Sequence, residues 1–216
     1  MSVSLPNGST IEIGSAVGTV KNITALTNAS PAVATSVAHG FTVGDYLIIT
    51  SGWSRLTDRL VRVLTAPTVD SFTLEGINTT DTGVFPAGSG VGTAQKVTTF
   101  TQITQILTTA SQGGEQQFLS YQFLEDDSQK EIPTTKTAGG FNFSVADDPS
   151  LAGYIALASA NDDRVKRALR VNLSNDSKLC YLGYCTLNET PTLTVNELMA
   201  CEATVRFLNK PTRYAT

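Results

Sequence analysis

Histidine occurs once in the chain, at His39, so any serine–histidine or cysteine–histidine catalytic pair would depend on this residue. His39 lies in the sequence Ala38-His39-Gly40-Phe41, which is typical of a turn between two strands. The sequence also lacks the G-x-S-x-G pattern that presents a nucleophilic serine in hydrolases. We therefore expect His39 to be a turn residue, and we expect that the protein is not an enzyme.

Three pairs of adjacent acidic residues could supply acid–base chemistry: Asp126-Asp127, Asp147-Asp148 and Asp162-Asp163. Glycosidases need two carboxyl groups that face each other across a substrate, and neighbours in the sequence do not provide this arrangement. Asp148 stands before an apolar pattern of helical spacing, so we expect it to cap the start of a helix. The D-x-[DN]-x-[DN]-G pattern of a calcium loop is absent from the sequence.

The three cysteines, Cys180, Cys185 and Cys201, form no C-x-x-C pair, and one histidine does not complete a zinc site with them. We expect all three to be small buried hydrophobic residues, and we predict no metal and no cofactor. The glycine-rich stretch 88–92 lacks the lysine of a phosphate-binding loop and precedes a predicted strand, which favours a turn.

The charge and the hydropathy of the sequence argue against two classes of partner, nucleic acids and membranes. The formal net charge is −4, and the basic residues between Arg164 and Arg170 fit a solvated corner better than a nucleic-acid contact. No apolar run approaches the ~20 residues of a membrane span, so we predict no membrane insertion. Residues 1–6 lack the basic and apolar regions of a signal peptide, so we expect synthesis in a cytoplasm.

The elements that position these residues are predicted to be mostly strands, because threonine and β-branched residues recur in short runs. Turn sequences separate the runs between residues 22 and 96, and no helical pattern lies between them, which indicates a small barrel or sandwich. The predicted strands there are 23–26, 32–37, 46–50, 60–65, 71–74 and 93–97.

The remainder of the chain is predicted to contain two strands, 118–124 and 141–145, joined by a charged polar loop over 125–140. A helix should begin at Asp148, with Leu151, Ile155 and Ala158 spaced along one apolar face, and the run 161–163 should end it. Three further strands follow in the prediction, at 167–173, 178–187 and 200–208.

The predicted fold class is mainly β. We expect a β-sandwich or barrel-forming domain with one packed α-helix, made of residues 1–21 and 97–216. Residues 22–96 would form a small inserted all-β domain. A sequential arrangement of two domains is the alternative.

Two stretches of the sequence carry a resemblance to known proteins. Residues 39–49 (HGFTVGDYLII) and 71–74 (SFTL) resemble a small β module that recurs in phage tail and virion proteins. Residues 98–216, together with the N-terminal segment, resemble siphophage tail tube proteins in the order of their elements. These elements are a hairpin with a long charged loop, a helix beginning Asp148-Pro149-Ser150, and a final strand containing residues 203–208 (ATVRFL).

The resemblance implies a structural subunit of a bacteriophage tail tube, which assembles as stacked hexameric rings around a channel for DNA delivery. The implied partners are further copies of the chain and the tape measure, tail terminator and distal tail proteins. DNA would pass through without stable binding. The implied location is the virion tail, assembled in the host cytoplasm, and the module of residues 22–96 would lie on the tube exterior.

In this family the long hairpin loop contacts the neighbouring ring. The resemblance therefore implies inter-ring contacts for Asp126, Asp127, Gln129, Lys130, Glu131 and Lys136. We expect residues 125–140 to become ordered only when rings stack, because they contain few apolar groups.

Polar and apolar residues alternate along the strands of this part, and the polar sets are candidates for lining the channel. Plain exposure to solvent is the alternative for each set. The candidates are Gln116, Ser120, Gln122, Asn142, Ser144, Glu202, Thr204 and Arg206.

Two other functions remain open at this stage. A distal tail or baseplate ring protein would share the fold but would not polymerise indefinitely. A carbohydrate-binding β module would need exposed aromatic side chains, for which Trp53, Tyr181 and Tyr184 are the candidates.

Overall fold

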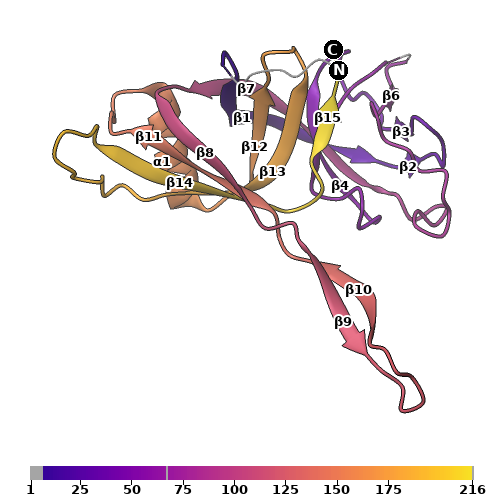
Figure 1. Cartoon of the computed structure of the whole chain (residues 1–216). Coiled ribbons are helices and arrows are strands. Elements are labelled where there is room, and N and C mark those ends of the chain that lie inside the picture. Colours follow the sequence, from indigo (N-terminus) through magenta and orange to yellow (C-terminus); the bar gives the residue numbers. More distant parts are fainter. Residues whose placement is uncertain (1–6, 67, 216) are drawn as a thin grey trace.

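The computed structural model describes residues 7–66 and 68–215, and within them it consists of antiparallel sheets and one helix (Figure 1). The helix is α1 (Ala152–Asp163). The strands are β1 (Thr10–Ile23), β2 (Ala25–Leu26), β3 (Val33–Thr35), β4 (Tyr46–Ser51), β5 (Arg59–Arg62), β6 (Ser71–Thr73), β7 (Gly92–Ile103), β8 (Ile106–Gln112), β9 (Gln116–Tyr121), β10 (Lys130–Lys136), β11 (Gly140–Ala146), β12 (Arg167–Asn172), β13 (Lys178–Leu187), β14 (Ala200–Phe207) and β15 (Thr212–Tyr214). The prediction of a mainly β protein with one packed helix is confirmed.

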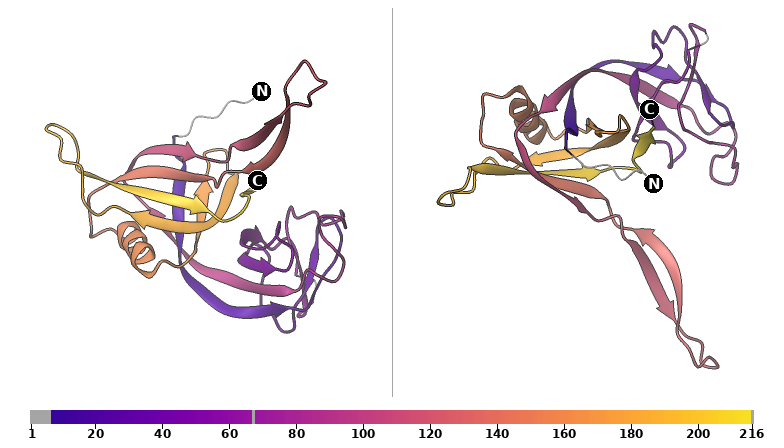
Figure 2. Two further views of the ribbon diagram at one scale, coloured as in Figure 1. Left: turned by 90° about the horizontal axis from the view of Figure 1, so that it is seen from below. Right: turned by 45° about the horizontal axis from the view of Figure 1, so that its top comes forward.

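Ten strands form one sheet in the order β5-β4-β7-β1-β12-β13-β14-β11-β8, with β15 paired to β13. Three short strands, β2, β3 and β6, form a second sheet, and β9 pairs with β10 alone. We call residues 22–96 the module and the rest of the described chain the body. Figure 2 shows the large sheet bending between the two. Among the described residues β5 and β8 stand at the two ends of the path and do not pair, so the single chain forms an open sheet and not a closed barrel.

Buried side chains gather in three clusters. The first draws on residues 23–94 and includes Trp53 and Phe72, both at most 2% exposed. The second lies between α1 and the strands of the body and includes Leu157. The third joins β4 and β5 to β12 and β13, with Tyr46 and Cys180 among its members. The module therefore packs against the body through an apolar contact of its own.

Strands β1 and β7 run together from one part of the molecule to the other (Figures 1 and 2). Ile13 of β1 lies in the second cluster and Ile23 of the same strand lies in the first. The predicted boundaries of the inserted domain, after residues 21 and 96, fall inside these two strands. The division into two domains stays a prediction, and the covalent link across each boundary is a paired strand.

The helix differs from its prediction in both start and buried face. The Asp148 carboxylate accepts hydrogen bonds from the Ser150 N–H at 3.1 Å and the Ser150 hydroxyl at 2.6 Å, in a turn before the helix. The buried residues of α1 are Gly153, Tyr154, Leu157 and Ala160, whereas Ile155 is 55% exposed.

Close packing of the helix on the sheet explains this choice of face. A Cβ atom on Gly153 would lie 2.6 Å from the Gln102 carbonyl oxygen of β7, so only glycine allows this approach. Within the residues that the structure describes, no helix has the length and apolar character needed to cross a membrane.

The predicted partnership of strands 118–124 and 141–145 is wrong. Strand β9 pairs with β10, which occupies residues predicted to be loop, and β11 pairs instead with β8 and β14. Every residue of β10 is exposed, so the strand carries no burial alternation that its sequence could display. Strands β8 and β15 were also absent from the prediction.

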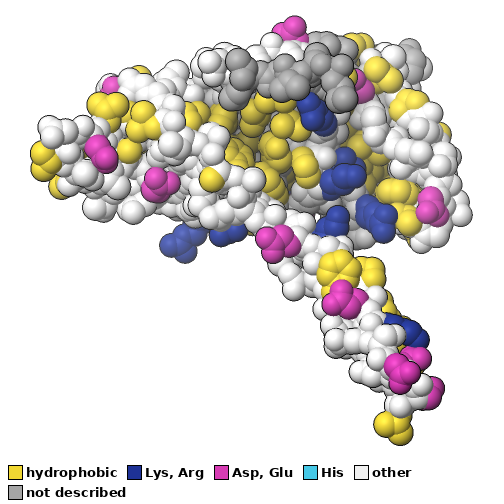
Figure 3. All heavy atoms as spheres, in the orientation of Figure 1, with side chains coloured by type: hydrophobic (Ala, Val, Ile, Leu, Met, Phe, Trp, Pro, Cys, Tyr) yellow, Lys and Arg dark blue, Asp and Glu magenta, His cyan; other side chains and the backbone are white. Residues whose placement is uncertain are grey.

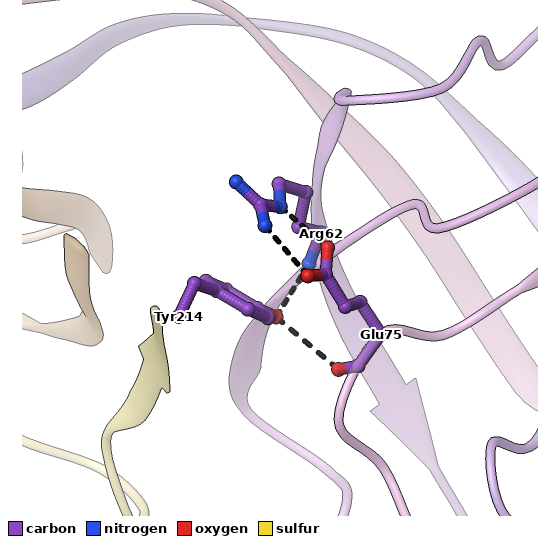
Figure 4. Close-up of polar contacts among 3 residues, drawn as sticks. All are labelled: Arg62, Glu75 and Tyr214. Atoms are coloured by element: carbon purple, nitrogen blue, oxygen red, sulfur yellow. Dashed lines mark hydrogen bonds and ion pairs between the residues drawn. The ribbon is translucent and has the colours of Figure 1, made fainter. Parts of the chain in front are cut away.

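The C-terminal strand fastens the module to the body. The Tyr214 hydroxyl accepts a hydrogen bond from the Arg62 N–H at 2.7 Å, and the Arg62 guanidinium forms two hydrogen bonds to the Glu75 carboxylate (Figure 4). The Arg62 guanidinium also lies over the Tyr214 ring, 4.6 Å from its centroid. Arg170 of β12, which ion-pairs with Glu12 of β1 at 2.6 Å, also lies over the ring of Tyr46 on β4, 4.9 Å from its centroid. These contacts set the orientation of the module on the body.

Candidate assembly surfaces

One face of the body sheet is polar across four neighbouring strands. Asn142 of β11 lies opposite Thr204 of β14, and Ser144 lies opposite Glu202. Arg206 lies opposite Gly140 on one side and Tyr184 of β13 on the other. Because successive strand residues point to opposite faces, these polar side chains share one face, which we call the polar face. Five of the eight predicted channel-lining residues thus come together: Asn142, Ser144, Glu202, Thr204 and Arg206.

The polar face extends beyond the predicted residues. Thr108 and Ala110 of β8 stand opposite Ser144 and Asn142, and Thr186 of β13 stands opposite Thr204. Sequence reasoning missed Thr108 and Ala110 because β8 has no buried face that would give it a regular pattern. Ser144 itself is 6% exposed, and its hydroxyl lies 2.7 Å from the Thr108 hydroxyl. Ser144 therefore helps to hold β8 to β11 and presents little surface.

The alternate residues of the same strands point to the apolar side. Phe143, Cys201, Val205 and Leu187 are each at most 5% exposed and belong to the cluster beneath α1. A strand group with one face on the core and the other face polar is the usual pattern of an antiparallel sheet in contact with water. Residues on the polar face can therefore change without disturbing the core.

Charge on the polar face is balanced. Glu202 and Arg206 are exposed and of opposite sign, and the remaining members are neutral threonine, serine, asparagine, tyrosine and alanine side chains. Stable binding of nucleic acid needs several lysine or arginine contacts to phosphate. This face offers one arginine, Arg206, which lies four residues beyond Glu202 on the same strand.

Three predicted channel-lining residues lie elsewhere. Gln116 and Ser120 are on β9, and Gln122 follows it, so all three belong to the hairpin of β9 and β10. Figure 1 shows this hairpin projecting away from the body sheet. We call residues 113–139 the arm. The Gln122 side-chain amide donates a hydrogen bond to the Asp126 carbonyl oxygen at 2.7 Å, and so helps to shape the tip of the arm.

The predicted inter-ring residues are all on the arm. Lys130 ion-pairs with Asp126 at 2.6 Å across the tip, and Glu131 and Lys136 face Ser120 and Gln116 across the hairpin. Asp127 and Gln129 are exposed in the tip loop. The expectation that residues 125–140 lack structure before stacking is wrong, because backbone pairing of β10 with β9 orders most of them in the single chain.

Apolar side chains are exposed on two protruding segments. On the arm, Phe118, Leu119 and Phe123 are 55–59% exposed, and Leu124 is fully exposed. The loop 188–199 between β13 and β14 presents a second set, among them Leu193 and Val195, which are at least 80% exposed. Exposed apolar groups at protruding tips are typical of contacts with another protein surface.

Strand β8 presents an open edge. It ends the sheet path, and within the described chain no strand pairs with its outer side. Unpaired N–H and C=O groups along such an edge are a template for another strand. The edge borders the polar face, so a strand added there would extend that face.

Residues considered for chemistry or sugar binding have structural roles. His39 is 4% exposed, its Nδ1 accepts a hydrogen bond from the Phe41 N–H at 2.9 Å, and its Nε2 lies near the Thr68 and Ser71 carbonyl oxygens. Trp53 is buried and donates from Nε1 to the Pro86 carbonyl oxygen, so it cannot stack on a sugar. Tyr181 is partly buried and stacks on Phe207, with ring centroids 4.3 Å apart.

The cysteines behave as core residues. All three are buried and free, and burial raises the pKa of the Cys180 and Cys185 thiols to about 12. A thiol with that pKa is neutral near pH 7 and is a poor nucleophile or metal ligand. Within residues 7–66 and 68–215, no group of three or more histidine, cysteine or acidic side chains is placed to hold a metal ion.

Residues 51–216 match the family described as phage tail tube protein (TTP). No curated protein matches the chain. Three solved cryo-EM structures are similar to parts of it. The cap that terminates the tube of an anti-feeding prophage is 14% identical, with a TM-score of 0.36, over 50% of this chain and 79% of that one.

The other two structures come from an extracellular contractile injection system, PVC. Its sheath–tube complex in the extended state is 10% identical, with a TM-score of 0.35, over 50% of this chain and 80% of that one. Its sheath/tube terminator in the extended state is also 10% identical, with a TM-score of 0.34, over 49% and 84%. All three TM-scores are below 0.5.

Proposed function

The chain belongs to the phage tail tube protein family, and we propose that it is the subunit that builds the tube as stacked hexameric rings for DNA delivery. The observation that carries this proposal is the strand group β11-β14-β13, which is polar on one face and lies on the core cluster of α1 with the other, while β8 extends the group at its edge. Six such groups arranged around one axis would line a channel with their polar faces. The open edge of β8 supplies one side of each junction.

The channel lining would then consist of Asn142, Glu202, Thr204 and Arg206 together with Thr108, Ala110, Tyr184 and Thr186. Balanced charge on this face supports the passage of DNA without retention, because affinity for phosphate rises with the number of cationic contacts. We place the module of residues 22–96 on the tube exterior, since it packs against the body through β4 and β5 and shares no residue with the polar face.

Most contacts in the proposed tube would be between copies of this chain, and only the two ends of the tube would contact other tail proteins. Open ends of the tube would be recognised by the tail terminator and distal tail proteins, and the tape measure protein would occupy the channel before DNA. Assembly would take place in the host cytoplasm, and the finished position is the virion tail. No cofactor or catalytic step is needed for this function.

Negative-stain electron microscopy of the purified chain over a range of concentrations tests the proposal. We expect hollow tubes with six-fold symmetry in end views. Isolated rings that never stack would instead indicate a distal tail or baseplate ring protein. Particles that remain monomeric at every concentration would reject the proposal.

A further inference from the structure

A cleft opens beside the base of the arm. It has a volume of about 540 Å³ and lies between the edge strand β8 and the strands β12 and β13. Leu107, Phe141, Val171, Tyr181 and Phe207 are among its lining residues. Phe141, Tyr181 and Phe207 pack on one another with ring centroids 4.3–6.0 Å apart, so the floor of the cleft is aromatic. Figure 3 shows hydrophobic side chains gathered in a hollow of the body, with lysine and arginine side chains beside it.

A cation stands at the rim of the cleft. Arg213 of β15 lies opposite Leu179, which lines the cleft, and burial raises the pKa of Tyr181 while the charge of Arg213 lowers it. Arg213 forms no ion pair within the described part of the chain. A ligand that fits here therefore combines an apolar group with a neighbouring carboxylate.

The tip of the arm has this chemistry. Leu124 is fully exposed, and the next residue, Glu125, is an exposed carboxylate with no ion pair among residues 7–66 and 68–215. Phe123 packs on Tyr121, with ring centroids 5.4 Å apart, and so stiffens the approach to Leu124. Burial of the Leu124 side chain away from water would be favourable in free energy. No other residue of the tip covers this side chain in the single chain.

The length of the arm indicates that the cleft which receives its tip belongs to another copy of the chain. The arm starts at Gly113, next to the cleft residue Ser111, and runs outward to Leu124. At ~3.3 Å per residue, this distance is roughly 35 Å. The tip therefore cannot reach the cleft of its own subunit, but a copy displaced along the arm presents its cleft there. A contact between two different patches of the same chain repeats from copy to copy, and it gives a filament where the rotation between copies does not close a ring.

We propose that Leu124 inserts into the aromatic cleft of a subunit in the next ring, with Glu125 facing the Arg213 of that subunit. This inference rests on the proposed function and adds to it the receiving site for the arm. It also assigns the tip contact to one apolar side chain and one ion pair, and not to the charged residues 126–136.

Disulfide trapping tests the contact in the full chain. The native cysteines are buried, so a Leu124→Cys/Ser111→Cys double variant carries two new accessible thiols per subunit. Mild oxidation of the assembled variant should give a ladder of covalent oligomers on a non-reducing gel. Each single variant should give dimers at most, and the control Leu193→Cys/Ser111→Cys, with its thiol on loop 188–199, should give no ladder.

Charge reversal tests the ion pair. Arg213→Glu should reduce tube formation at least ten-fold at a fixed concentration, and Arg213→Glu/Glu125→Lys should restore it. Rescue by the double variant also excludes simple misfolding of the first variant.

The outcomes separate the two claims. Tubes in the micrographs with no ladder from Leu124→Cys/Ser111→Cys overturn this contact and leave the tube function standing. A ladder from a protein that forms no tubes supports the contact and rejects the tube function. The absence of both rejects both.

Discussion

The Tyr214 hydroxyl, on the third residue from the end of the sequence, accepts a hydrogen bond from the Arg62 N–H at 2.7 Å. These two residues lie on β15 and β5, so the contact ties the C-terminal strand of the body to the module. The same hydroxyl lies 3.5 Å from the Glu75 carbonyl oxygen, to which it donates. The end of the chain thus fixes a segment that is far away in the sequence.

Tyr214→Phe should lower the free energy of unfolding by about 1 kcal/mol, because the Arg62 N–H loses its hydrogen-bond acceptor. Chemical denaturation at pH 7 measures the change. Tyr184→Phe is the matched control, since Tyr184 is 45% exposed and should stay within about 0.5 kcal/mol of the wild type. Equal losses in the two variants would contradict a role for the Tyr214 contact.

Gly153→Ala should destabilise the protein by about 1–3 kcal/mol, although alanine has a higher helix propensity than glycine. The reason is that the new methyl group would stand 2.6 Å from the Gln102 carbonyl oxygen and 2.7 Å from the Ile103 Cα. Thermal unfolding followed by circular dichroism measures the effect. Gly18→Ala is the control, because the nearest atom to its Cβ would be 3.5 Å away. A gain in stability for Gly153→Ala would show that α1 does not pack so closely.

Stability should fall as the pH rises from about 9 towards 12. Burial raises the pKa of the Cys180 and Cys185 thiols from 9.0 to about 12, so the unfolded chain loses these protons first. A raised folded pKa contributes stability that is fully present below the unfolded value and is lost above it. Each thiol should lower the free energy of unfolding by up to about 1.4 kcal/mol per pH unit in this window. Denaturation series at pH 8, 9.5 and 10.5 measure the slope.

Cys180→Ala should reduce that slope, whatever it does to stability at pH 7. A surface substitution such as Arg55→Ala should leave the slope unchanged, because Arg55 is exposed. If wild type and Cys180→Ala show the same dependence on pH, titration of the Cys180 thiol is not coupled to unfolding.

The wild-type subunit should show no measurable DNA affinity at physiological salt, whereas Glu202→Lys/Thr204→Lys should bind DNA in a strongly salt-dependent manner. The double change places two lysines beside Arg206 on the polar face, and each phosphate contact releases counterions. Fluorescence anisotropy with labelled DNA measures both proteins. Glu189→Lys/Thr190→Lys adds the same charge on loop 188–199 and should bind more weakly. Tight binding by the wild type would argue against a conduit.

Replacing residues 115–137 with an Asn-Gly turn should leave the body folded and abolish tubes. None of the residues removed belongs to the three buried clusters, so the melting temperature should change by only a few degrees. Differential scanning calorimetry and electron microscopy measure the two effects. Normal tubes from the shortened chain would remove the arm from the assembly mechanism.

Local sequence patterns predicted several elements well. The segment 178–187 was expected to be a strand and is β13 with the same bounds, and residues 141–145 lie within β11. Polar and apolar residues alternate along residues 141–145 of β11, and buried residues recur with a two-residue period over most of β13. The same alternation picked out Asn142, Glu202, Thr204 and Arg206, which the structure gathers on one face.

Elements without burial on either face were missed or misassigned. Strand β10 is exposed throughout, so its sequence resembles that of a charged loop, and β8 lacks a buried residue along its length. Their pairing depends on backbone hydrogen bonds, which any sequence without a run of prolines can make. For the same reason, Gln116, Ser120 and Gln122 were grouped with the body although they lie on the arm.

The sequence by itself determined the mainly β class, the presence of one helix after Asp148 and the polar side of β11 and β14, because these follow from the order of residue types along one segment. Tertiary structure alone decided which strands pair, which helix face is buried, and where the cleft lies. These depend on contacts such as Gly153 with Gln102 and Tyr214 with Arg62, whose partners are far apart in the chain and leave no periodic signal in it.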